Sequence, residues 1–153
     1  MFELNPNLKI KEEILLGSKI FIIDNFYKNP DEIYDQVVLI SRQAKEFFNR
    51  PLTNIVFMGM GEPLMNYNNV LKSIDKITSK SGLGMSPRRI VVSTSGVPKM
   101  IKKMADDNVK FKLAVSLHSA INETRTSIMP FNEKMNLDEL ADSLQYWLSL
   151  IHI

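Results

Sequence analysis

Apolar residues gather along the middle of this chain in three short runs that are bounded by polar and turn residues. Runs of this kind predict strands, and segments with apolar residues at helical spacing separate them. The first run shows no alternation with polar residues, so we expect that strand to be buried on both faces. The strands are expected over Asn54–Met58, Arg89–Thr94 and Phe111–Ser116.

Local start signals predict four helices around these strands. Asn29 can cap the first helix, Pro30 takes its first position and Glu32 completes a capping box. Asn136 and Glu139 form a second capping box ahead of an apolar helical face near the end of the chain. The two other helices are expected over Asn68–Ser79 and Pro98–Met104.

The alternation of strands and helices predicts an α/β fold with a parallel sheet. In such folds the ligand binds at the carboxyl edge of the strands, where loops expose backbone groups to it. Three segments follow the predicted strands, and we expect them to meet at that edge: Gly59–Pro63, Ser93–Gly96 and Ser116–His118.

Each of these strand tips has a functional and a structural interpretation. Gly59 and Gly61 let the main chain approach a ligand closely, or they serve a tight turn. The hydroxyls of Ser93–Ser95 hold ribose hydroxyls, or cap the helix that begins near Pro98, and we expect capping for at least one of them. His118 is a base or hydrogen-bond donor, or a structural residue at a strand end.

The composition of the chain excludes several kinds of functional site. At 153 residues the chain is one domain by length. It contains no cysteine, which excludes disulfides, a thiolate nucleophile and cysteine-held zinc or iron–sulfur clusters built from this polypeptide alone. The sequence has no apolar run long enough to span a bilayer and no signal-peptide pattern at its start, so a cytoplasmic location without membrane contact is expected.

Positive charge is unevenly distributed. The segment from Val70 to Lys112 contains ten Lys or Arg residues and three acidic residues, although the whole chain has a net charge of +2. Such a segment can meet phosphate groups of a nucleic acid. The alternative is a solvated outer helix face, because Lys72, Lys76 and Lys80 lie at helical spacing.

Five segments, taken in order, resemble the RlmN family of radical S-adenosylmethionine (SAM) enzymes. They include the Gly-Glu-Pro loop after the first predicted strand and the Ser-Leu-His tip after the third. Several motifs in register make the resemblance specific, and it covers residues 29–147. The segments are Pro30–Val38, Leu52–Tyr67, Arg88–Gly96, Leu113–His118 and Ile128–Asn132.

The resemblance implies a partial βα barrel, open on one side, with parallel strands and outer helices. It implies methylation of C2 of an adenine in 23S rRNA, and in tRNA for many members, by a monomeric enzyme that uses SAM and a 4Fe-4S cluster. It also implies that the Gly-Glu-Pro loop takes the amino end of SAM, largely through main-chain groups. The SAM-binding residues implied are Gly61, Glu62, Ser93, Ser116, Leu117 and His118.

The chain departs from the family pattern at the cysteines on which the family's chemistry depends. The family holds its cluster with three cysteines in a C-x-x-x-C-x-x-C pattern, expected shortly before Asn29. Here that region reads Gly17-Ser18-Lys19-Ile20-Phe21-Ile22-Ile23-Asp24, without cysteine. The family's late methylated cysteine is also missing. We therefore expect no catalytic residue, no metal ligand and no catalysis of the family reaction in this polypeptide.

Residues 1–28 and 148–153 look foreign to the family, and 29–147 form the partial barrel domain. Ile, Lys, Asn and Phe make up 16 of the first 29 residues, as in A/T-rich DNA read in the wrong frame. The alternative is a genuine short protein in which Ile20–Asp24 is a strand.

Three hypotheses for the function follow. The chain is a fragment of an RNA adenine-C2 methyltransferase, with cluster cysteines encoded nearby. Alternatively, it is a cysteine-free module that binds SAM or RNA, or a decayed relative without activity.

Overall fold

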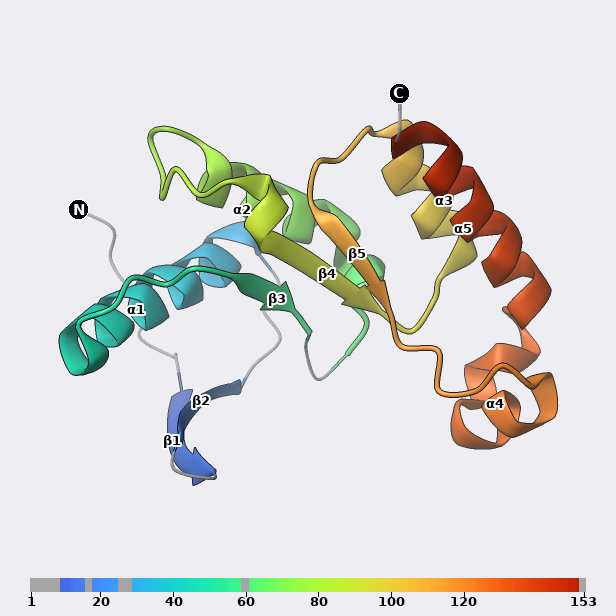
Figure 1. Cartoon of the computed structure of the whole chain (residues 1–153), viewed down its shortest axis with the longest axis horizontal. Helices are drawn as coiled ribbons and strands as arrows, with labels where there is room; N and C mark the ends of the chain where they lie inside the picture. The colour runs from blue at the N-terminus through green and yellow to red at the C-terminus, as the bar shows by residue number, and fades with distance from the viewer. Residues whose placement is uncertain (1–8, 16–17, 25–28, 59–60, 152–153) are drawn as a thin grey trace.

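A computed structural model describes residues 9–15, 18–24, 29–58 and 61–151 (Figure 1). Its centre is a three-stranded parallel sheet in the order β3-β4-β5. The predicted parallel sheet is therefore confirmed, and the carboxyl ends of all three strands lie at one edge. The strands are β3 (Ile55–Phe57), β4 (Ile90–Thr94) and β5 (Lys112–Val115).

Five α-helices accompany the sheet in the described part of the chain. The asparagine caps are confirmed, because the backbone N–H of Glu32 donates to Asn29 Oδ1 at 2.9 Å and that of Glu139 donates to Asn136 Oδ1 at 3.0 Å. The short helix α4 was not predicted; it is capped by Ile121 without a side-chain hydrogen bond. The helices are α1 (Pro30–Phe48), α2 (Tyr67–Thr78), α3 (Pro98–Asp106), α4 (Asn122–Ile128) and α5 (Leu137–Ile151).

One face of the sheet packs on helices and forms the core. Ile90 and Val92 of β4 are fully buried there, together with Ile77 of α2 and Ile101 and Met104 of α3. Helix α5 packs beside α3 and adds further apolar side chains to the same core (Figure 1). Burial of these aliphatic side chains is the main stabilising term for the domain.

The opposite face of the sheet is open, which corrects the expectation that the first strand is buried on both faces. Val56 of β3 keeps 52% of its surface exposed and Met58 keeps 69%. Both side chains point away from the helix-covered face, because neighbouring residues of a strand alternate between faces. The described helices cover only one face, and an apolar run does not reveal that difference.

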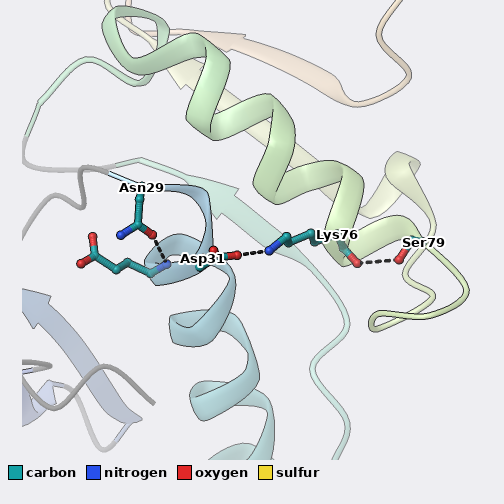
Figure 2. A network of polar contacts seen from close by, with 5 residues as sticks. Asn29, Asp31, Lys76 and Ser79 are labelled. Carbon is teal, nitrogen blue, oxygen red and sulfur yellow. Dashed lines mark hydrogen bonds and ion pairs between the residues drawn. The ribbon is translucent and has the colours of Figure 1, made fainter. Parts of the chain in front are cut away.

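Helix α1 packs on α2, and polar contacts hold the two helices near the start of α1 (Figure 2). Lys76 of α2 forms an ion pair with Asp31 in the first turn of α1. The hydroxyl of Ser79 donates to the backbone carbonyl of Lys76 at 3.1 Å, at the end of α2. The side chains of Lys76 and Asp31 are exposed, so their ion pair links the two helices at the surface of the domain and not in its core.

An antiparallel hairpin precedes α1. It pairs β1 (Lys9–Leu15) with β2 (Ser18–Asp24), so the segment Ile20–Asp24 is a strand. Helix α5 runs through Leu148 to Ile151, beyond the last residue of the family resemblance. Among the described residues, no helix combines the length and apolar character needed to cross a membrane.

Candidate functional site

The three strand tips meet at one rim of the molecule, as predicted. The backbone N–H of Ser116, just after β5, donates to the carbonyl of Thr94 at the end of β4, at 2.8 Å. On the other side of β4, the tip after β3 continues into a short 3-10 helix, Pro63–Asn66, which is capped by Glu62. Gly59 and Met60 of the first tip lie outside the described residues.

The carboxylate of Glu62 joins the first tip to the second. Its Oε1 accepts hydrogen bonds from the Leu64 backbone N–H at 3.0 Å and from the Thr94 hydroxyl at 2.7 Å. Its Oε2 accepts from the backbone N–H and the hydroxyl of Ser95, at 2.7 and 2.6 Å. Charge-assisted hydrogen bonds of these lengths are among the stronger polar contacts in proteins.

The expectation that a serine or threonine of the second tip caps the following helix is wrong. Helix α3 is capped by Val97, without a side-chain hydrogen bond. The hydroxyl of Thr94 instead donates to Glu62 and accepts the backbone N–H of Gly96 at 3.0 Å. The cap position falls on Val97, after these residues, and the hydroxyls of Thr94 and Ser95 donate to the Glu62 carboxylate of the neighbouring strand tip.

Arg125 of α4 joins the second tip to the third, and it was missed by the sequence analysis. Its side chain is completely buried. Nη2 donates to the carbonyl of Ser95 at 2.5 Å and Nε donates to the carbonyl of Leu117 at 3.2 Å. Nη1 contacts Asn132 Oδ1 and lies 3.4 Å from the carbonyl of Met135. Burial lowers the pKa of the guanidinium from its usual value.

Gly96 lets this cluster close on α5. Its φ of +99° is a conformation that favours glycine. A Cβ at this position would lie 3.0 Å from Leu140 Cδ1 and 3.4 Å from Arg125 Nη2. The backbone of the second tip therefore packs closely against Leu140 of α5 and Arg125 of α4.

The predicted ligand residues of the second and third tips lie at the same edge. Ser93 is buried and sits beside Ala114 in the parallel ladder, on the open face of the sheet. Ser116 comes two residues after Ala114 and therefore lies on the same face. Within the described part of the chain, neither hydroxyl forms a side-chain hydrogen bond. Both are therefore available to a ligand on this face.

Leu117 and His118 extend the third tip into solvent, and both side chains are exposed. His118 has a φ of +62°, in the left-handed region that histidine enters more readily than most residues. Gly61 of the first tip is also exposed, and a Cβ built on it would meet no atom within 4 Å. Space around its main chain is thus open, although no backbone strain demands glycine here.

The basic segment lies mainly away from this rim. Lys72 and Lys76 are on the exposed side of α2, which agrees with the solvated-face interpretation. Lys76 pairs with Asp31, and Lys103 of α3 pairs with Asp107 at 2.9 Å. A separate hollow between the end of α1 and the start of β3 is lined by Ala44, Phe48, Arg50, Pro51, Leu52, Thr53 and Asn54.

Comparison with known proteins shows which proteins this chain resembles. The chain is 70% identical over 121 residues to a protein of Christiangramia forsetii named "Probable dual-specificity RNA methyltransferase RlmN", and 73% identical over 118 residues to the protein of the same name from Flavobacterium psychrophilum. These matches cover 79% and 77% of this chain and 34% of each relative, so the chain spans about a third of their length. No family model matches the chain.

A solved structure shows a related similarity. The crystal structure of a radical SAM methyltransferase from Sphaerobacter thermophilus superposes with a TM-score of 0.77 at 36% sequence identity, over 82% of this chain and 36% of that one. The predicted fold, a fragment of an open βα barrel of the radical SAM type, is therefore confirmed. The resemblance to the RlmN family is confirmed as well, over about four fifths of the chain.

Proposed function

We propose that this chain, a relative of the RlmN proteins, is a segment of a radical SAM methyltransferase that methylates C2 of an adenine in 23S rRNA, and in tRNA. The observation that carries the proposal is the rim itself. Three separate motifs of the family pattern fall on three adjacent strand tips of one parallel sheet. The identity of 70% or more to two RlmN proteins supports the same substrate class. The intact enzyme is proposed to be a cytoplasmic monomer.

The residues of the rim fit SAM. Gly61 leaves its main chain open, which suits the amino end of the ligand. Ser93 and Ser116 present hydroxyls on the open face of the sheet, where they can hydrogen-bond to the polar groups of SAM. Leu117 and His118 would form the exposed end of the same surface. The chain's own contribution is thus to bind and orient SAM.

The residues of this chain do not fit the 4Fe-4S cluster. Such a cluster needs thiolate ligands, and the sequence contains no cysteine. The part of the chain that the structure describes also holds no group of three His, Cys, Asp or Glu residues placed to bind a metal ion. No step of the radical reaction is therefore assigned to residues of this chain.

The missing cysteines favour a second candidate function, a module that binds SAM or RNA without catalysis. Both candidates would bind SAM at the same rim, whereas RNA would be bound by basic residues outside it. The exposed basic residues Arg88 and Arg89, which precede β4, belong to the segment proposed to meet phosphate. Binding of RNA through such residues should weaken as salt rises.

A chimera tests the enzymatic candidate. Residues 29–147 of this chain replace the matching segment of the Flavobacterium psychrophilum relative, which keeps its own cysteines. The chimera is expressed in bacteria that lack their own enzyme, and methylated adenosines in 23S rRNA and tRNA are quantified by mass spectrometry. We expect 2-methyladenosine in both RNAs. The method separates it from 8-methyladenosine, so it also reports the position of the methyl group.

Two controls make the result decisive. The unmodified relative gives the full level of methylation, and a chimera with Gly61→Val reports on the rim, since the added side chain blocks close approach of a ligand to the main chain. A chimera that is folded and contains the cluster, yet leaves both RNAs unmethylated, would contradict the enzymatic candidate. Binding of SAM by the unmodified 153-residue chain without iron would then support the module.

A further inference from the structure

Two charged groups, the part-buried carboxylate of Glu62 and the buried guanidinium of Arg125, converge on one residue of the rim. The Glu62 carboxylate accepts the backbone N–H and the hydroxyl of Ser95, and Arg125 donates to the carbonyl of the same residue. Glu62 belongs to the first tip, Ser95 to the second, and Arg125 also holds the third through the carbonyl of Leu117. Every polar group of Ser95 is therefore engaged, and its contacts link all three tips.

The Glu62 side chain has little capacity left for a ligand. Its two oxygens accept four hydrogen bonds from Leu64, Thr94 and Ser95. A carboxylate offers about four lone-pair sites, so these contacts fill it. A ligand ammonium group could bind the carboxylate only by displacing one of them. The side chain of Glu62 thus holds the protein together, and contact of this residue with SAM falls to its main chain.

Arg125 is engaged to a similar degree. It donates to two backbone carbonyls of the rim, and its Nη1 reaches Asn132 and the carbonyl of Met135. Asn132 in turn donates to Thr126 Oγ1 at 2.8 Å, which fixes the acceptor. Within the described residues no carboxylate pairs with Arg125, so its hydrogen bonds all go to neutral oxygens, and its guanidinium also lies over the Phe131 ring, 5.5 Å from the ring centroid. The planar guanidinium offers five N–H donors in a fixed arrangement, which suits it to bind several carbonyl oxygens at once.

We infer that Glu62, Ser95 and Arg125 form one relay that sets the relative positions of the three SAM-binding strand tips, with Glu62 and Arg125 acting as positioning residues. The consequence for SAM rests on the function proposed above, but the relay itself is a property of the fold. The relay predicts that a change at the first tip alters the third, although Glu62 and Leu117 share no hydrogen bond in the described structure.

Amide hydrogen exchange in the full 153-residue chain measures this coupling. The Leu64 amide reports on the first tip because it donates to Glu62, and the Ser119 amide reports on the third because it donates to the carbonyl of Leu117 at 2.7 Å. Arg125→Lys keeps the positive charge but loses the planar set of guanidinium N–H donors. We expect it to speed exchange at Leu64 by about tenfold. Glu62→Gln, which turns one acceptor into a donor, should speed exchange at Ser119.

A matched control and a double variant separate the relay from general effects. Lys102→Met removes one positive charge from the exposed side of α3 and should leave both amides unchanged. In the double variant, Glu62→Gln should add little to the effect of Arg125→Lys at Ser119, because the connection is already broken. If each substitution affects only its own tip while the chain stays folded, the relay is refuted. If Arg125→Lys unfolds the chain, the effect of Glu62→Gln on exchange at Ser119 decides whether the relay exists.

Titration with SAM connects the relay to binding. Ser95→Ala removes one hydrogen bond to Glu62 and changes no charge. We expect the affinity for SAM to fall about tenfold in this variant. Unchanged affinity would refute the positioning role. If the unmodified chain does not bind SAM at all, the proposed function fails, and the exchange experiment still decides the relay.

Discussion

The two faces of the central sheet differ sharply. The face against the helices contains residues such as Ile90 and Val92, which are fully buried, whereas Val56 and Met58 on the other face keep 52% and 69% of their surfaces exposed. Polar side chains follow the same division: Ser93 and Ser116 belong to the open face. The covered face stabilises the domain, and the open face is the one that we propose binds SAM. Stability and binding should therefore respond to different substitutions.

A pair of glycine substitutions should give the largest contrast. Gly96→Ala places a Cβ at a φ of +99° and 3.0 Å from Leu140, on the covered side. We expect it to lower the free energy of unfolding by about 3 kcal/mol, measured by urea denaturation. Gly61→Ala at the open rim meets no atom within 4 Å and should leave stability unchanged. Equal losses for the two variants would contradict the division.

Two valine substitutions of identical chemistry compare the faces directly. Val92→Ala removes two methyl groups from a fully buried position of β4 and should cost about 2 kcal/mol of unfolding free energy. Val56→Ala removes them from a half-exposed position of β3 and should cost about 1 kcal/mol or less. A loss at Val56 as large as that at Val92 would indicate that the open face is covered in solution.

Tyr67 tests a polar contact on the covered side. Its hydroxyl donates to Asp107 Oδ2 at 2.6 Å, and Tyr67→Phe should cost about 1 kcal/mol. Burial, and then the hydrogen bond to Asp107, raise the pKa of Tyr67 above its usual value. A raised folded-state pKa means that the stabilisation is complete below about pH 10 and declines as the pH rises further.

The difference in stability between the native chain and Tyr67→Phe should therefore shrink above pH 10. Tyr146→Phe is the matched control, since that hydroxyl donates to Asp106 Oδ1 at the same distance from a much more exposed side chain. Its loss should be the smaller of the two. A difference for Tyr67→Phe that grows with pH would contradict the assigned cause of the pKa shift.

The exposed ion pair between α1 and α2 should have the smallest effect. Lys76→Ala breaks the pair with Asp31 and should cost about 0.5 kcal/mol or less at low salt (Figure 2). Because both side chains are exposed, the loss should largely vanish at 1 M salt. Lys72→Ala, on the exposed side of the same helix, provides the reference.

Local signals predicted much of this fold, and contacts between distant residues account for what was missed. The asparagine caps were predictable because a cap involves residues three positions apart. The meeting of the strand tips followed from the rule for parallel sheets. The partners of Glu62, by contrast, lie 32 and 33 residues away at Thr94 and Ser95.

Arg125 shows the same limit more strongly. It lies in a short polar helix without apolar periodicity, so its sequence context favours an exposed side chain. Only the folded chain reveals that carbonyls from two strand tips surround it. The seven-residue spacing to Asn132 was the available signal, and it carries little information without the turn between them.

Titration of the isotope-labelled full chain with SAM, followed by amide chemical shifts, tests the central claim most directly. The account predicts shifts at Gly61, Ser93, Ser116, Leu117 and His118, with the hollow at the start of β3 unaffected. Shifts confined to that hollow, around Phe48 and Leu52, or a folded chain that gives no shifts at saturating SAM, would contradict the claim that the open rim binds SAM.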